Sequence, residues 1–313
     1  MDDGRIVILL SGVIGILLAG SLASFVLSRR AHSEAMQTTV RNLDSRVKAW
    51  WVMVTIFAAA FLLGPTVTLI LFALTSFYCL REMITLTPTR PADHRAVATA
   101  FYVFIPLQYW LIFDEWQTLF AIAIPVYAFL LLPVLTVLAG ETDHFLERTA
   151  KLQWGLMLTV YCISHAPALL ILDIPGHEGE NFLWLFFLIA VVQLSDVLQY
   201  VFGKLFGRHK VAPRISPAKT WEGLIGGGLS AALVGAGLYW ITPFSPLQAG
   251  GMALAIVVAG FCGGLVLSAI KRSLGAKDWG TMIEGHGGAL DRMDSVTFAA
   301  PIFFHLTNYF FVA

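Results

Sequence analysis

Long apolar stretches alternate with short polar connections along the whole chain. A helix needs about 20 mostly apolar residues to cross a bilayer. Ten stretches are candidates: 6–28, 50–63, 65–86, 96–113, 117–139, 152–173, 181–204, 221–242, 247–270 and 291–312. The second and third are divided at Gly64-Pro65, because proline interrupts helical hydrogen bonding. The pattern predicts an all-α, polytopic transmembrane helical bundle of ten spans.

Composition agrees with a membrane protein. The chain is 58% hydrophobic and only 13% charged, whereas soluble domains carry about 25% charged residues. Its formal net charge is zero, so no overall basic character indicates a nucleic-acid partner. We therefore expect membrane lipid, and not nucleic acid, around this protein.

The basic residues orient the predicted bundle. Of the 20 lysines and arginines, all except Arg5 fall in alternate connections, at 29–48, 81–95, 148–151, 204–219 and 271–292. Connections that carry such residues face the cytoplasm under the positive-inside rule. The pattern thus predicts cytoplasmic basic connections and both termini outside.

Glycines and charges concentrate in the last two basic connections. The segment Ser268 to Asp294 holds eight formal charges and five glycines between two apolar runs. Ionisable groups at a membrane boundary are costly and tend to be functional. We therefore divide the chain into N-terminal helices, residues 1–180, and a C-terminal catalytic region, residues 181–313, with its chemistry on the cytoplasmic face.

Two carboxylates begin the final predicted helix. Asp291 and Asp294 are three residues apart, so their side chains share one helix face. They could hold a divalent cation together, or simply cap the helix N-terminus. Further polar residues nearby favour a catalytic site: Lys277, Asp278, His286 and Arg292.

Cations just upstream could serve phosphate binding. Lys271 and Arg272 end an apolar run, where they either neutralise a polyphosphate or extend toward the membrane surface. His286, set between two glycines, could bond phosphate or transfer a proton.

A second group of residues begins at Asp196, which lies inside a predicted span. Ser216 is expected to be a helix N-cap, and Pro217 the first helical residue. Lys219 and Thr220 would then lie in a first turn that attracts phosphate. Gly223 and Gly227 form a G-x-x-x-G pair, which favours close helix packing and leaves a homodimer contact open.

The two segments match a family signature at many fixed positions. The first block contains Ser268, Lys271, Arg272, Lys277, Asp278, Gly280, Gly285, His286, Gly287, Gly288, Leu290, Asp291, Arg292 and Asp294. The second block contains Asp196, Gly203, Gly207, Ala212, Pro213 and 216–223. Together they resemble the phosphatidate cytidylyltransferase family, also called CDP-diacylglycerol synthase, over residues 190–300.

The resemblance implies an activity and a set of roles. It implies Mg²⁺-dependent transfer of a cytidylyl group from CTP to phosphatidate in a bacterial inner membrane, giving CDP-diacylglycerol and pyrophosphate. The implied metal ligands are Asp196, Asp291 and Asp294. The implied catalytic residues are Asp291, Asp294, Lys277, Asp278, His286 and Arg292. The implied substrate-binding residues are Ser216, Lys219, Thr220, Ser268, Lys271 and Arg272.

Two departures from the family pattern concern the metal site. Gly264 stands where the family has an aspartate that is taken as a metal ligand, and residues 196–200 read D-V-L-Q-Y instead of D-T-G-A-Y. Whether a second cation binds is therefore left open. A different lipid-phosphate acceptor, a transporter or flippase, and a scaffold without turnover are competing hypotheses for the function.

Overall fold

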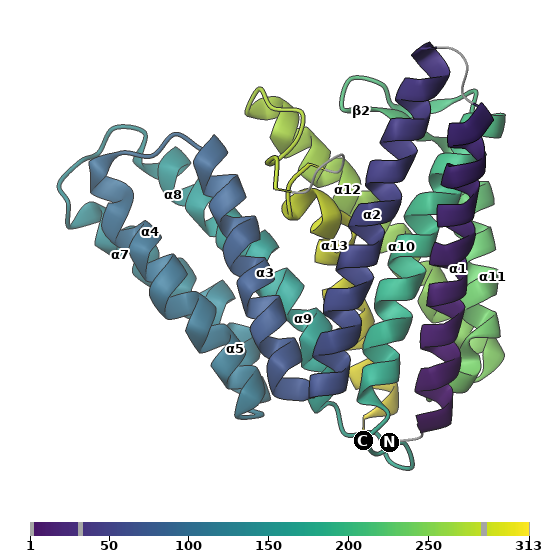
Figure 1. Cartoon of the computed structure of the whole chain (residues 1–313). Coiled ribbons are helices and arrows are strands. Elements are labelled where there is room, and N and C mark those ends of the chain that lie inside the picture. Colours follow the sequence, from purple (N-terminus) through teal and green to yellow (C-terminus); the bar gives the residue numbers. More distant parts are fainter. Residues whose placement is uncertain (1–2, 31–33, 283–286, 313) are drawn as a thin grey trace.

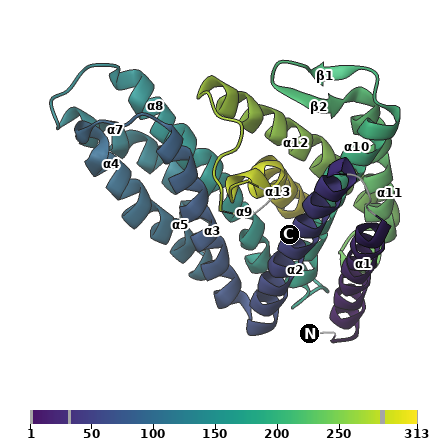
Figure 2. The same ribbon diagram turned by 45° about the horizontal axis from the view of Figure 1, so that its top comes forward.

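The computed structural model describes residues 3–30, 34–282 and 287–312. Apart from one short hairpin, the described chain is a bundle of helices (Figure 1). In order, these are α1 (Asp3–Arg30), α2 (Glu34–Leu63), α3 (Pro65–Leu86), α4 (His94–Thr99), α5 (Ile105–Phe113), α6 (Gln117–Ile122), α7 (Phe129–Val137), α8 (Phe145–Leu156), α9 (Cys162–Ala168), α10 (Asn181–Phe206), α11 (Gly228–Gly237), α12 (Pro246–Ser273) and α13 (Leu290–Phe311). The hairpin consists of β1 (Lys210–Ala212) and β2 (Ser216–Thr220), and Figure 2 shows it at one end of α10.

Three pairs of these helices run on through a wider helical turn. The turns lie at Ala100–Phe104 between α4 and α5, at Ala123–Ala128 between α6 and α7, and at Met157–Tyr161 between α8 and α9. The first two lie beside or include a proline, Pro106 and Pro125, which has no N–H to donate to the preceding turn. Each pair therefore occupies one predicted span.

The predicted membrane bundle is confirmed as an all-α architecture. Seven helical stretches of the described chain are long and apolar enough to cross a bilayer, and Val47–Leu63 and Gly223–Gly237 are shorter apolar helices. The chain is thus an integral membrane protein, whereas ten complete crossings stay a prediction. The division at Gly64 is correct, because α2 ends at Leu63 and α3 begins at Pro65.

The two ends of the bundle differ in charge. α1 begins and α13 ends at the bottom of Figure 1, and the hairpin and the α7–α8 connection lie at the top. At the bottom, the Arg5 guanidinium lies 2.7 Å from the Glu180 carboxylate, which joins the start of α1 to the start of α10. The connections that carry the other lysines and arginines lie at the opposite end, at the top of Figure 1. Which side of the membrane that end faces stays a prediction.

Glycines allow the C-terminal helices to pack backbone against backbone. A Cβ atom at Gly263 of α12 would lie 2.7 Å from the Asp294 carbonyl oxygen of α13, and one at Gly227 would lie 2.4 Å from the Gln199 nitrogen of α10. Gly223 likewise faces the Gln199 carbonyl. The G-x-x-x-G pair is therefore used for packing within one chain.

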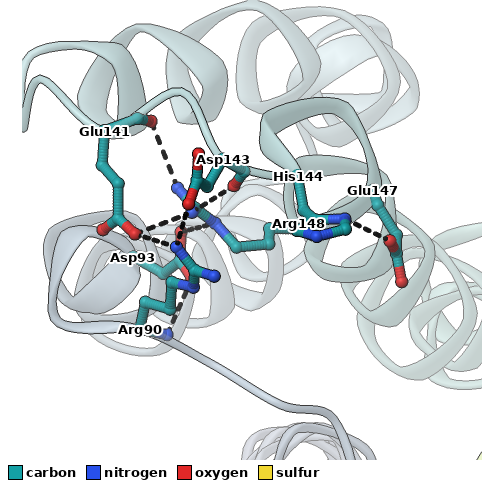
Figure 3. Close-up of polar contacts among 7 residues, drawn as sticks. All are labelled: Arg90, Asp93, Glu141, Asp143, His144, Glu147 and Arg148. Carbon is teal, nitrogen blue, oxygen red and sulfur yellow. Dashed lines mark hydrogen bonds and ion pairs between the residues drawn. The ribbon is translucent and has the colours of Figure 1, made fainter.

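A charged cluster joins the α3–α4 and α7–α8 connections (Figure 3). Arg148 Nε donates to Asp93 Oδ1 at 3.1 Å, and these side chains are only 6% and 8% exposed. Arg90 pairs with Glu141 and, at 3.3 Å, with Asp143. Because both guanidinium groups of this cluster meet carboxylates, the cluster serves to hold two connections together.

The glycine contacts predict a position-specific effect on stability. Gly227→Ala places a methyl group against the α10 backbone, and we expect it to lower the free energy of unfolding by about 1–3 kcal/mol. Gly237→Ala is the matched control, since a Cβ there has no atom within 4 Å. Unfolding in detergent measures both variants, and equal stability would contradict the packing role of Gly227.

Candidate active site

The β1–β2 hairpin replaces the helix start that was predicted at Ser216. β1 and β2 pair antiparallel, with Lys210 opposite Thr220 and Ala212 opposite Ser216. Pro213 favours a turn here, and Ile215 N–H donates to the Ala212 carbonyl at 3.1 Å. The N-cap prediction for Ser216 was therefore wrong: Thr220 caps the next helix, and its Oγ1 accepts the Gly223 N–H at 3.1 Å.

Glu222 closes the base of the hairpin. Its carboxylate accepts the backbone N–H of His209 at 3.2 Å and lies 2.6 Å from His209 Nδ1. Hydrogen bonds from its own backbone N–H and from the His209 side chain lower the pKa of Glu222 to about 2. This arrangement, here called the Glu222 clasp, fixes the strand that carries Lys219.

Lys219 extends from β2 to α12. Its Nζ donates to the Phe261 carbonyl at 3.2 Å and lies 4.6 Å from the centre of the Phe261 ring. A Cβ atom at Gly264 would be only 2.5 Å from this Nζ. The ammonium therefore occupies the space that an aspartate at position 264 would need. Burial lowers the pKa of Lys219, while the carboxylates of Asp196 and Asp294 act in the opposite direction.

Asp196 and Asp294 meet beside Lys219. Ser295 joins them, because its Oγ donates to Asp196 Oδ1 at 3.1 Å and its N–H donates to Asp294 Oδ1 at 2.8 Å. Both carboxylates are within electrostatic range of each other, of Lys219 and of Arg292. The second oxygen of each has no hydrogen-bond partner among the residues that the structure describes. Two half-buried acids with free oxygens form a donor pair suited to a hard cation.

Asp291 has a different environment from Asp294. Lys271 Nζ donates to its Oδ1 at 2.6 Å, and Oδ2 accepts the N–H groups of Trp279 at 2.8 Å and Gly288 at 2.9 Å. Lys271 and Asp291 are 8% and 9% exposed, so this is a buried ion pair. Lys271, in the last turn of α12, thus pairs with Asp291. Asp291 also holds the α12–α13 connection, because its carboxylate accepts the Trp279 and Gly288 N–H groups.

Glu82 of α3 is a residue that the sequence signature did not include. Its carboxylate accepts the N–H of Ala289 at 2.8 Å and of Leu290 at 2.9 Å, at the N-terminus of α13. The sequence signal that could have drawn attention to it is an acid within the apolar stretch 65–86. What it contacts could not be read from that signal.

The remaining predicted residues lie around this group. Arg272 Nε donates to the Ile215 carbonyl at 3.3 Å, which ties α12 to the hairpin. Lys277 and Asp278 are exposed, and Ser268 and Ser216 are half-buried. Arg292 is also half-buried, and its Nε has no hydrogen-bond partner in the described part of the chain. His286 lies outside the described residues.

Similarity to known proteins covers the whole site. The profile of the cytidylyltransferase family matches residues 44–310. An uncharacterized protein of Escherichia coli K12, YnbB, is 39% identical over 298 residues, which are 94% of this chain and 95% of that protein. A phosphatidate cytidylyltransferase of Brucella abortus is 39% identical over 137 residues, and one of Staphylococcus aureus is 38% identical over 127 residues.

These matches define the class of the protein. The chain belongs to the cytidylyltransferase family, a family of nucleotidyltransferase enzymes, as the signature residues indicated. The two phosphatidate cytidylyltransferases align with 41% and 40% of this chain, and with 48% and 49% of their own lengths. The chain thus spans about half the length of those relatives, whereas it aligns with YnbB almost end to end.

The Glu222 clasp predicts a pH dependence of the hairpin. The pKa of Glu222 is about 2 in the folded chain against an ordinary 4.5, so its contribution is complete above about pH 4.5 and disappears as the pH falls toward 2. We expect the hydrogen-exchange protection factor of the Trp221 amide, which donates to the His209 carbonyl, to fall over this interval. Glu222→Gln should remove the dependence, and identical profiles for the two proteins would contradict it.

Proposed function

We propose that this protein transfers a cytidylyl group from CTP to a lipid phosphate, with phosphatidate as the acceptor, giving CDP-diacylglycerol and pyrophosphate. The observation that carries the proposal is the meeting of Asp196, Lys219 and Asp294 at one end of a bundle of apolar helices. The family match supplies the nucleotide, and the names of the two phosphatidate cytidylyltransferases suggest the acceptor.

The reaction is a substitution at phosphorus. An oxygen of the lipid phosphate bonds to the α-phosphorus of CTP, the bond from that phosphorus to the bridging oxygen breaks, and pyrophosphate leaves. Such a transfer asks the protein mainly for positioning and charge stabilisation. The Lys219 ammonium and the Arg292 guanidinium would neutralise phosphate oxygens. Lys271, already paired with Asp291, would contribute by holding the loop.

A magnesium ion fits the donor set. Asp196 and Asp294 would hold it, since each has one carboxylate oxygen that no described residue occupies, whereas Asp291 uses its oxygens within the protein. No cluster of three or more His, Cys, Asp or Glu ligands occurs in the described residues. Substrate phosphates and water would complete the shell, as Mg²⁺ usually requires. The bound ion would neutralise part of the negative charge of the substrate phosphates.

The same end of the bundle would face the cytoplasm, where CTP is available, in a bacterial inner membrane. A flippase is less well supported, because 19 of the 20 lysines and arginines fall in the connections on one side of the predicted spans rather than within the spans. A lipid phosphate different from phosphatidate is the second candidate for the acceptor.

Asp294→Asn tests the proposed reaction. With purified protein, labelled CTP, phosphatidate and Mg²⁺, we expect wild-type protein to form labelled lipid. Asp294→Asn should lose about 100-fold in kcat, because it weakens the hold on the metal ion that would neutralise the reacting phosphate. Asp114→Asn is the matched control, an exposed aspartate in the α5–α6 connection. If no lipid phosphate accepts label from the wild-type protein, the proposal is wrong.

Asp196→Asn tests the metal assignment separately. We expect it to weaken Mn²⁺ binding by about 10-fold or more, measured by electron paramagnetic resonance without substrate, because one of two anionic ligands becomes neutral. Asp291→Asn should affect Mn²⁺ binding less. Equal Mn²⁺ affinity in the Asp196→Asn and wild-type proteins would remove Asp196 from the metal site.

A further inference from the structure

Glu82 reaches the proposed site from a distant part of the chain. It belongs to α3, yet its two carboxylate oxygens accept N–H groups that lie 207 and 208 residues later, those of Ala289 and Leu290. These N–H groups belong to the N-terminus of α13, where a helix has unpaired donors and a partial positive charge. The Glu82 carboxylate accepts two of these unpaired N–H groups and places a negative charge beside the partial positive charge of the helix N-terminus.

The Glu82 carboxylate lies against two glycines, Gly280 and Gly288, in the space that a larger side chain would need. A Cβ atom at Gly280 would lie 2.8 Å from Glu82 Oε1, and one at Gly288 would lie 2.3 Å from Oε2. Glycine permits close approach of a backbone to an anion. At these two positions the anion is a side chain of the protein itself.

The α12–α13 connection is therefore held by two carboxylates. Asp291 accepts the N–H groups of Trp279 and Gly288, and Glu82 accepts the next two along the chain. Together they fix where α13 begins. That starting point determines where Asp294 and Ser295, one turn later, meet Asp196 of α10.

We propose that Glu82 is a positioning residue for cytidylyl transfer, acting by holding the N-terminus of α13 in the register that brings Asp294 to Asp196. The inference rests on the proposed function. Both oxygens of Glu82 are already engaged by backbone amides, so it acts through α13 and needs no contact with either substrate.

The first test compares kcat with KM in Glu82 variants. Glu82→Ala should lower kcat by about 100-fold, as small displacements of reacting groups do, and leave KM for CTP within about 3-fold. Glu82→Gln keeps one acceptor oxygen and should be intermediate, with kcat about 10-fold below wild type. Glu147→Gln is the matched control, because it removes the same charge from a side chain that pairs with Lys151, away from α13.

The second test uses Gly288 as a steric probe. Gly288→Ala alone should lower kcat, since its methyl group displaces the Glu82 carboxylate. In the Glu82→Ala background, Gly288→Ala should lower kcat by less than about 2-fold. The two residues share one contact, so their effects on kcat are not additive. Non-additivity requires a shared contact, so this cycle distinguishes the proposed role from a general loss of stability.

The outcomes separate the inference from the proposed function. If wild-type protein shows no turnover with any lipid phosphate, the proposed function fails; hydrogen exchange at Ala289 and Leu290 still tests whether Glu82 holds α13. If wild-type protein is active and both Glu82 variants keep its kcat, or raise only KM, the inference is wrong. Additive effects of Glu82→Ala and Gly288→Ala would also overturn it.

Discussion

The structure of the site depends on the cost of placing charge at the end of an apolar bundle. An uncompensated buried charge costs several kcal/mol, by order of magnitude, so each ionisable group drawn inward must meet a partner. Lys271 meets Asp291, and Glu82 meets the amides of α13. Asp196 and Asp294 are only partly satisfied, through Ser295 and the nearby Lys219. The proposed magnesium ion, together with the substrate phosphates, would be the partner that the protein itself does not supply.

The sequence predicted those features that rest on local chemistry. The break at Gly64-Pro65 follows from proline, and the grouping of basic connections at one end follows from their alternation along the chain. The signature residues identified the family, and the structure brings three of them, Asp196, Lys219 and Asp294, close to one another. The hairpin was missed because strand pairing joins residues 210–212 to 216–220, a longer-range choice than the local capping preference of Ser216. Glu82 was missed because its contact spans 207 residues.

The glycines also show that long-range contacts could not be predicted from the sequence. The sequence indicated close helix packing for Gly227 and no contact partner for Gly288 or Gly264. In the structure Gly227 faces a helix backbone, Gly288 faces a carboxylate, and Gly264 faces an ammonium. One residue type thus serves helix packing, loop anchoring and the shape of a polar site, and only the fold distinguishes these uses.

Gly264 links side-chain volume to the electrostatic balance of the site. The absence of a side chain there gives the Lys219 ammonium its place, 2.5 Å from where a Cβ would stand. A carboxylate at 264 would add negative charge and also push the resident positive charge aside, so both effects would draw in more external cations. A glycine at position 264 therefore lets the site carry part of its counter-charge covalently, as the Lys219 ammonium.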